Sequence, residues 1–447
     1  MNFILRPYQK ECIETLNENF KTEKYQLIQL PTGSGKTVIF WEYITKYAKS
    51  ALILVPSITL AEQVMNVSQH FIDKSKISCK YGKKRHIKNF KDYHVTTFHS
   101  FKSFIKQNEK IQKKFDIVVI DECHRSKSTV FEKQLNKFSN YERCFGVTAT
   151  PYRLDERNLM EIFSCISFKK SLNEMIEEGY LCDLIGKRIE TKIKLSSNVK
   201  SNDFSSTFLS KNLCNAERNN IIVDSYSRNC TDRKTIIFCI DISHCEKLKS
   251  IFLEKGYLAE SIHQKKSHSD RKRILSDFKE GKINILLNVQ MLTEGFDEPS
   301  IQAVIIARPT MSKALYTQMV GRGTRIYPGK KNCLIIDICD NYYNLCTFLS
   351  LSFPNHPNIK TNKSHKDFLS IKEINKNIEQ FLTIVDSYDE KEFNFNEFNT
   401  EKVLKKINYE HKEIEYPEWI TWEESLFIRW KKRKMEEFLK SGLYPRI

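Results

Sequence analysis

Short, almost continuously apolar runs recur along this chain, and longer stretches of helical character separate them. Strands of a parallel sheet that is covered on both faces have this pattern, because both of their faces are buried. A first series of runs comprises residues 25–31, 51–56, 94–98, 115–121 and 144–150, and a second comprises residues 235–240, 259–263, 284–289, 301–307 and 333–338. The pattern predicts two α/β domains in tandem, each built on a parallel sheet with flanking helices.

The spacing of these runs also predicts the domain boundaries. We expect residues 1–185 to form a nucleotide-binding domain and residues 216–355 to form a second domain of the same class. The stretch between them, 186–215, is polar and rich in Ser, Asn and Lys, which indicates a linker or a peripheral insertion. Residues 356–447 are predicted to be a small, mostly helical C-terminal extension.

Residues 418–434 of that extension hold three of the four tryptophans together with a basic cluster. Thr421 and Glu424 fit a capping box, so a helix is expected to begin there. Two interpretations stay open. The aromatic and basic side chains stack on bases and neutralise phosphates, or an amphipathic helix packs its tryptophans on the core and leaves its basic side in solvent.

Charge and cysteine usage limit the class of protein. Lys and Arg number 72 against 55 Asp and Glu, a net charge of +17, which favours a nucleic-acid partner. The 13 cysteines include no C-x-x-C pair, so neither a disulfide framework nor a zinc site is expected. No signal peptide or membrane-spanning run is found. We expect a soluble intracellular protein of the nucleoid or another DNA-containing compartment, not secreted and not bound to membranes.

A glycine-rich segment with the sequence LPTGSGKT follows the first apolar run. Backbone N–H groups in such a loop wrap a β-phosphate, the lysine reaches the β and γ oxygens, and the threonine hydroxyl binds Mg²⁺. The strict pattern has glycine where this chain has Leu30, so the alternative is a turn that happens to carry a lysine. The candidate nucleotide-binding residues are Pro31, Thr32, Gly33, Ser34, Gly35, Lys36 and Thr37.

Two further strand ends carry polar side chains. Asp121 and Glu122 close the run 115–121, where Asp121 is expected to hold Mg²⁺ through water and Glu122 to activate the attacking water. The alternative for Asp121 is a helix N-cap. Thr148 and Thr150 end the run 144–150 and are expected either to couple the site to a neighbouring domain or simply to cap a strand end.

In the second half of the chain, QMVGRGTR places Arg322 and Arg325 three residues apart, which on a helix would put them on one face. Two guanidinium groups directed at one point favour a phosphate ligand, and the alternative is a solvated basic helix end. Upstream, Gly295 permits close backbone approach and Asp297 is expected to bind a ribose hydroxyl or a partner arginine, unless the segment is a plain turn.

In this order the motifs resemble those of the superfamily 2 helicases and translocases of the DEAD/DEAH-like class. The matching stretches are RPYQ (6–9), LPTGSGKT (30–37), VPS (55–57), DECH (121–124), VTATPYR (147–153), EGFDEP (294–299) and QMVGRGTR (318–325). RPYQ and the stretch from GVTATPYR to GYL look most like the group of RadD, UvsW, XPB and the motor subunits of restriction enzymes.

The resemblance implies two RecA-like domains that close on ATP and Mg²⁺. It implies that Gln9, supported by Arg6, reads the adenine and that Tyr8 stacks on the base. Gln318 would join Arg322 and Arg325 at the γ-phosphate, beside the catalytic Lys36, Asp121 and Glu122.

The implied function is an ATP-dependent helicase or translocase that acts on nucleic acid, DNA rather than RNA, in repair, recombination or replication. VPSITLAEQ and VTAT differ from the matching motifs of DEAD-box RNA helicases, PTREL and SAT. Three alternatives remain: the motor subunit of a restriction or defence complex, which would have a protein partner, an RNA helicase, and a nucleotide-gated clamp that does not hydrolyse ATP. Three cysteines in residues 333–346 are spaced unlike a zinc ribbon.

Overall fold

The computed structural model describes residues 4–81, 90–125, 129–138, 140–149, 159–194, 203–289, 291–292, 296–341, 345–346, 348 and 369–370. These residues form two compact units. The first unit runs to Leu181 and takes in residues 291–299 and 317–326, and the second holds the rest of the described chain. Thr150, Gly295 and nearly all of the predicted C-terminal extension lie outside the described residues.

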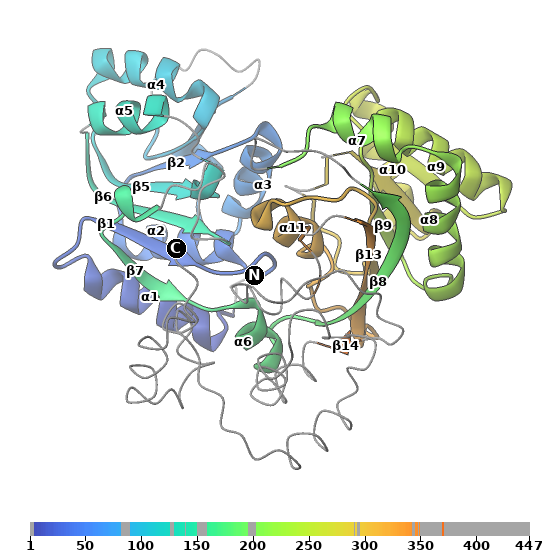
Figure 1. The fold of residues 1–447 in the computed structure, drawn as a ribbon. Coiled ribbons are helices and arrows are strands. Elements are labelled where there is room, and N and C mark those ends of the chain that lie inside the picture. The colour runs from blue at the N-terminus through green and yellow to red at the C-terminus, as the bar shows by residue number, and fades with distance from the viewer. Residues whose placement is uncertain are drawn as a thin grey trace, which may run out of the picture. The chain divides into compact units, whose positions relative to one another are not determined.

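The first unit is built on a seven-stranded sheet, within the described residues, whose order is β3-β4-β2-β5-β6-β1-β7 (Figure 1). Neighbouring strands pair in parallel throughout. The strands are β1 (Tyr25–Gln29), β2 (Ala51–Val55), β3 (Ile77–Lys80), β4 (Tyr93–Thr97), β5 (Phe115–Asp121), β6 (Tyr141–Thr148) and β7 (Cys165–Lys169). The helices are α1 (Pro7–Asn19), α2 (Lys36–Tyr47), α3 (Ile58–Ser68), α4 (Phe98–Ile111), α5 (Thr129–Lys137) and α6 (Leu172–Glu177).

Helices cover both faces of this sheet. α4 and α5 pack together on one side, and α1 and α2 pack together on the other (Figure 1). Every residue of β2 is buried, as expected for a central strand between two layers of helices. Ser57 caps α3 by accepting a hydrogen bond from the N–H of Leu60 at 3.3 Å. Because its strands run in parallel, their carboxyl ends lie at one edge of the sheet.

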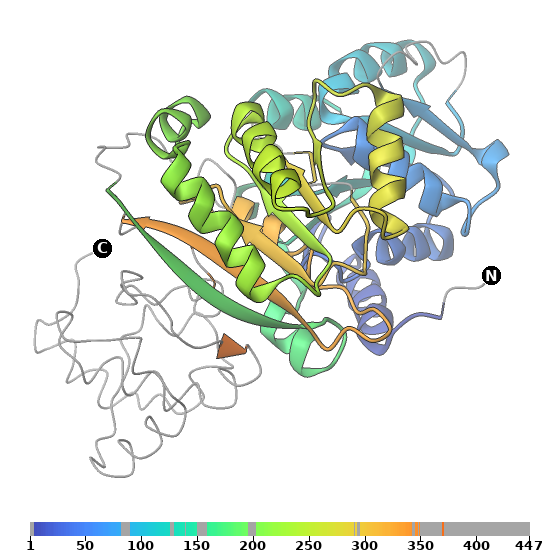
Figure 2. The same cartoon turned by 90° about the vertical axis from the view of Figure 1, so that its right-hand side faces the viewer.

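The second unit has a sheet of the same class, with the order β10-β11-β9-β12-β13-β8-β14 in the described residues. All pairs are parallel except β14 with β8. Figure 2 shows α8 and α9 side by side on one face of this sheet. The strands are β8 (Asp183–Lys194), β9 (Thr235–Phe238), β10 (Ala259–Ile262), β11 (Ile285–Asn288), β12 (Ala303–Ile306), β13 (Asn332–Asn341) and β14 (Leu369–Ser370), and the helices are α7 (Ser206–Leu213), α8 (Ala216–Asn229), α9 (Ile242–Glu254), α10 (His268–Lys279) and α11 (Lys313–Val320).

A buried ion pair joins three elements of the second unit. Arg218 of α8 and Asp340 of β13 are both fully buried, and their side chains meet at 2.8 Å. Arg218 also donates to the carbonyl oxygen of Ala307 at 2.9 Å, and Thr191 of β8 donates to Asp340 at 2.6 Å. Because every charge has a close partner, this polar cluster is tolerated inside the unit.

The predicted pair of α/β domains with parallel sheets is confirmed. The segment 186–215 differs from the expectation, because most of β8 and all of α7 lie in it. Its polar sequence misled the prediction for a physical reason. Arg188 and Thr191 of β8 are buried, and Thr191 is satisfied by Asp340 of the adjacent strand. No helix in the described part of the chain is long and apolar enough to cross a membrane.

Candidate functional site

The phosphate loop joins the end of β1 to the start of α2. Gly33 and Gly35 have φ angles of 89° and 77°, a left-handed conformation that side chains rarely adopt. A Cβ at Gly35 would lie 2.7 Å from Nε2 of Gln9. Both conformation and space therefore require glycine here, although Leu30 replaces the first glycine of the strict pattern.

Two side chains of the loop suit a phosphate ligand. Lys36 is buried, and its ammonium donates to the carbonyl oxygens of Leu30 and Pro31 at 3.3 Å each. Ser34 is also buried, and its hydroxyl has no hydrogen-bond partner among the described residues. A buried hydroxyl without a partner is costly unless a ligand satisfies it, so the loop fits an oxygen-rich ligand. Thr37 lies half-buried in the first turn of α2.

The first turn of α1 contacts this loop. The hydroxyl of Tyr8 and the amide nitrogen of Gln9 both donate to the carbonyl oxygen of Ser34, the latter at 3.3 Å. The amide oxygen of Gln9 accepts from the N–H of Arg6 at 2.9 Å. One donor and one acceptor site of Gln9 therefore remain for a base edge.

The resemblance implied that Tyr8 stacks on the base of the nucleotide, but in the structure its ring packs against another aromatic ring. Tyr8 is buried, its ring lies 4.7 Å from that of Tyr180, and burial raises the pKa of its phenol, which keeps the donor protonated. Arg6 donates to the carbonyl oxygen of Tyr180 at 3.0 Å and lies over its ring at 5.8 Å. Tyr180 is the more exposed ring of the pair.

The acidic pair lies at the end of β5. Asp121 is buried and accepts the N–H of Glu122 at 2.9 Å. Glu122 adopts a φ of 47°, in the left-handed region where only glycine is free of strain. Its carboxylate lies 3.8 Å from the ammonium of Lys36. The structure thus brings the predicted base beside the phosphate loop.

His124 connects three of the predicted residues. Its Nδ1 lies 2.9 Å from the hydroxyl of Thr148 and 3.3 Å from the carboxylate of Glu122, and its Nε2 lies 2.9 Å from the amide nitrogen of Gln318. An amide nitrogen donates, so with this amide orientation Nε2 accepts and the proton lies on Nδ1. His124 itself was not predicted as a site residue.

The turn after α11 carries the two arginines. α11 ends at Val320, so the expected helix face is wrong for Arg322 and Arg325. Both guanidinium groups nevertheless reach one acceptor, the carbonyl oxygen of Phe296, at 2.6 Å from Arg322 and 3.4 Å from Arg325. The predicted convergence of the two charges on one point is therefore observed, without a helix to create it.

Glycine allows this turn to approach the phosphate loop. A Cβ at Gly321 would lie only 2.6 Å from the Cβ of Thr32. The hydroxyl of Thr324 donates to the carbonyl oxygen of Thr32 at 3.0 Å. A Cβ at Gly33 would lie 3.5 Å from Cγ of Arg325. Close backbone approach explains why glycine occurs in this part of the motif.

Asp297 takes the second of its two expected partners. Its carboxylate lies 2.6 Å from the guanidinium of Arg325. Burial lowers the pKa of Arg325 and Asp297 opposes that shift, but an arginine stays charged in either case. Among the described residues, no group of three or more His, Cys, Asp or Glu side chains is placed to hold a metal ion.

Family models match both halves of the described chain. Residues 2–153 match the family described as type III restriction enzyme, res subunit, and residues 202–327 match the helicase conserved C-terminal domain. The chain belongs to the superfamily 2 helicases and translocases.

Relatives of this superfamily 2 chain include two yeast proteins. A Saccharomyces cerevisiae protein named as a candidate ATP-dependent helicase, IRC3, is 28% identical over 356 residues, 75% of this chain and 51% of the relative. A Schizosaccharomyces pombe protein named as a candidate mitochondrial ATP-dependent helicase, irc3, is 31% identical over 363 residues, 75% of this chain and 57% of the relative. The chain thus spans little more than half the length of these relatives.

Solved structures share the fold of this superfamily 2 chain, with its two RecA-like domains. The type ISP restriction-modification enzyme LlaBIII, solved bound to DNA, has a TM-score of 0.58 at 18% identity, over 76% of this chain and 28% of that one. Structures with this fold include complexes with DNA and with RNA. The fold alone therefore does not choose between the two nucleic acids.

Two residues of this superfamily 2 site were missed from the sequence. His124 stands inside the quoted motif DECH, and Tyr180 stands in the quoted GYL, yet neither was given a role. A polar side chain three residues after Asp121 at a buried strand end was a signal for His124. Its contact with Gln318, 194 residues away, had no local signal.

Proposed function

We propose that this protein is an ATP-dependent translocase or helicase that acts on nucleic acid, with DNA as its preferred substrate. One observation carries the proposal: within one unit, a phosphate loop, an acidic pair and the QMVGRGTR turn lie in mutual contact through Lys36, Glu122, His124 and Gln318. A simple nucleotide-binding turn would not need the contacts that His124 makes with Glu122 and with Gln318.

The residues of the phosphate loop suit the β- and γ-phosphates of ATP. The unpartnered Ser34 hydroxyl and the glycine backbone would bind phosphate oxygens, and Lys36 would exchange its two carbonyl contacts for them. Mg²⁺, held by Thr37 and by Asp121 through water, would neutralise phosphate charge. Glu122 would then orient the attacking water and take its proton.

His124 would report the state of this site to the motif around Gln318. Its ring touches Glu122 and Thr148 through one nitrogen and Gln318 through the other. A change in the charge or position of Glu122 during hydrolysis therefore changes what the ring presents to Gln318. This contact is the physical basis on which we propose that hydrolysis is coupled to movement.

The two arginines would stabilise the charge that develops during phosphoryl transfer. They are held together at the carbonyl oxygen of Phe296, and Arg325 is restrained by Asp297. Arginines that act in this way contribute about 10³–10⁵ in rate in other phosphoryl-transfer enzymes.

The preference for DNA is supported by the restriction-enzyme family model and by a net charge of +17. The same family model favours a second candidate, the motor subunit of a restriction or defence complex whose nuclease lies on another chain. Both candidates place the protein in an intracellular, DNA-containing compartment. They differ in whether the chain moves on DNA without a partner.

The experiment that tests the proposal compares ATP hydrolysis with single-stranded DNA, duplex DNA, branched DNA and RNA as separate activators. We expect hydrolysis to rise with DNA and to rise less with RNA. Stronger activation by RNA would reverse the preference, and hydrolysis that no nucleic acid changes would contradict the function. Displacement of a triplex-forming strand from duplex DNA by the isolated protein would separate the first candidate from the second.

A further inference from the structure

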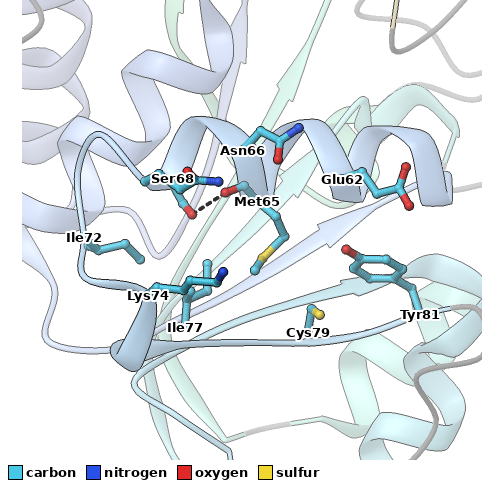
Figure 3. Close-up of a pocket in the computed structure, with 10 residues that line it drawn as sticks. Glu62, Met65, Asn66, Ser68, Ile72, Lys74, Ile77, Cys79 and Tyr81 are labelled. Carbon is cyan, nitrogen blue, oxygen red and sulfur yellow. Dashed lines mark hydrogen bonds between the residues drawn. The ribbon is translucent and has the colours of Figure 1, made fainter. Parts of the chain in front are cut away.

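A pocket of about 260 Å³ lies between α3 and β3 in the first unit (Figure 3). In Figure 3 the thioether of Met65 points from α3 toward β3, and the thiol of Cys79 points back from the strand. Ile77 and Tyr81 are buried and form the floor. The exposed side chains Glu62, Asn66, Gln69 and Lys74 form the rim.

This pocket is separate from the phosphate loop. β3 is an edge strand, and β1 stands five positions along the sheet, roughly 24 Å away at the usual strand spacing. One end of the pocket nevertheless lies at the carboxyl edge, because Tyr81 follows the last residue of β3 and Glu62 lies in the first turns of α3. Ligands of parallel sheets bind at this edge.

The lining residues exclude several kinds of ligand. Among the described residues of the lining, Lys74 is the one cation and Glu62 the one carboxylate, so in this part of the chain neither an anion nor a metal ion finds enough opposite charge. The volume lies below the roughly 300–1,000 Å³ of sites for drug-sized molecules, which excludes a whole nucleotide cofactor. A polar rim over an apolar floor also disfavours a purely apolar chain.

A single flat heterocycle matches what remains. Its face would lie on Met65, Ile77 and Tyr81, and its edge would meet the amides of Asn66 and Gln69. Glu62 only accepts hydrogen bonds when ionised, so it would favour a ring that carries an exocyclic amine. Cytosine and adenine have such an amine, and uracil and thymine do not.

We propose that this pocket binds one unstacked base of the nucleic acid, with preference for a base that carries an exocyclic amine. The inference rests on the proposed function. Bases displaced from a stack are held in proteins by stacking on one face and by hydrogen bonds along one edge. A seated base would anchor the strand on the first unit, in addition to contacts with phosphates.

The test measures the Kd of the full chain for three strands of equal length, about twelve nucleotides, at one salt concentration. The strands are all-deoxycytidine, all-deoxyuridine and wholly abasic. We expect the deoxycytidine strand to bind about tenfold more tightly than the abasic strand, and several-fold more tightly than the deoxyuridine strand.

Met65→Trp fills the pocket and should remove most of these differences. Met160→Trp is the matched control, because Met160 is exposed and outside the lining, and it should keep them. Glu62→Gln alters only an exposed carboxylate and should narrow the preference for deoxycytidine over deoxyuridine. If Met65→Trp fails to fold, that narrowing decides the question.

The pocket assignment would be overturned if Met65→Trp and the wild type showed the same ratio of Kd values for the abasic and deoxycytidine strands. Equal affinity of the wild type for all three strands would overturn it as well, and the proposed function would stand if DNA still stimulated ATP hydrolysis. Absence of both binding and stimulation would reject the inference and the proposed function together.

Discussion

At the scale of single residues, Glu122 differs from its neighbour Asp121 in backbone conformation. Its backbone lies in the left-handed region, at a φ of 47°. That conformation carries the carboxylate out of the strand to lie near Lys36 and His124. The neighbouring Asp121 keeps the regular strand geometry and stays buried. Adjacent acids in one sequence thus occupy different environments and are suited to different tasks.

Replacing Glu122 with Gln should leave ATP binding nearly unchanged and lower hydrolysis by about 10²–10⁴-fold, because the amide keeps the shape but cannot take a proton. The measurements are the Kd for ATP and the turnover rate with DNA. Glu161→Gln, at an exposed position of the same unit, is the control. Turnover near the wild-type rate in the Glu122 variant would remove Glu122 from the role of base.

Arg322→Lys and Arg325→Lys should each spare ATP binding but abolish most of the stimulation by DNA. Lysine keeps the charge and loses the planar fork that grips two phosphate oxygens. Arg273→Lys, at an exposed site in α10, controls for a general effect of the substitution. Full DNA-stimulated turnover in both variants would mean that the arginines serve only to hold Phe296 and Asp297.

At the scale of elements, α11 is shared between the two units. Its residues up to Tyr316 belong with the second unit, and those from Thr317 belong with the first. The buried hydroxyl of Tyr316 donates to both oxygens of Asp337 in β13, at 2.8 and 3.0 Å. Gln318 stands two residues later. This tether therefore anchors the start of α11 to β13 within the second unit.

Tyr316→Phe removes the tether and keeps the ring. We expect the turnover rate with DNA to fall several-fold while KM for ATP and the thermal midpoint change little, because the loss affects alignment and one hydrogen bond of about 1 kcal/mol. Steady-state kinetics with a thermal melt provide the check. A fall in stability with normal turnover would make Tyr316 purely structural.

Asp337 should make the second unit less stable as the pH rises. Burial raises its pKa to about 6, from an ordinary value of 3.8. The folded state then holds a proton that the unfolded chain has already released, so this contribution to stability is present below about pH 4 and is lost as the pH approaches 6. Urea unfolding of the wild type and Asp337→Asn at pH 4.5 and 7 measures it, and the variant should show the weaker fall in stability between the two pH values. Equal falls would contradict the assignment.

The burial of each strand decided whether it could be predicted from the sequence. Central strands such as β2 and β5 are apolar on both faces and were predicted. β3 and β7 lie at the edges of the first sheet with partly exposed faces, so they lack an apolar run. In the site, contiguous motifs were predicted, whereas His124 with Gln318 depends on contacts between distant segments. The expected helix under Arg322 failed because spacing alone cannot distinguish a helix from a turn.

At the scale of the whole molecule, two units with parallel sheets are stabilised by different means. The first core cluster gathers Phe101 and Phe104 of α4 and Phe138, the residue after α5, against the sheet. The second unit adds the buried pair of Arg218 and Asp340 to an aliphatic cluster. Loss of one member of this buried ion pair should therefore lower the free energy of unfolding more than loss of one member of an ion pair at the surface.

Asp340→Ala should lower the free energy of unfolding of the second unit by about 3–5 kcal/mol, because it leaves a guanidinium buried without its counter-ion. Asp224→Ala breaks the surface pair with Lys255, whose side chains are 50% and 42% exposed, and should cost less than about 1 kcal/mol. Urea unfolding of both variants compares them. Equal losses would mean that Arg218 finds another partner.

The left-handed backbone of Glu122 has a consequence for the evolution of such chains. Glycine would adopt this conformation without strain, so Glu122→Gly should produce a more stable protein that no longer turns over ATP. In the role proposed above for Glu122, selection for hydrolysis keeps a glutamate at this position although glycine would make the protein more stable. In a lineage that retained the fold but abandoned its motor activity, this position should drift to glycine or asparagine early. The residue at position 122 would then distinguish relatives that hydrolyse ATP from relatives that have lost this activity.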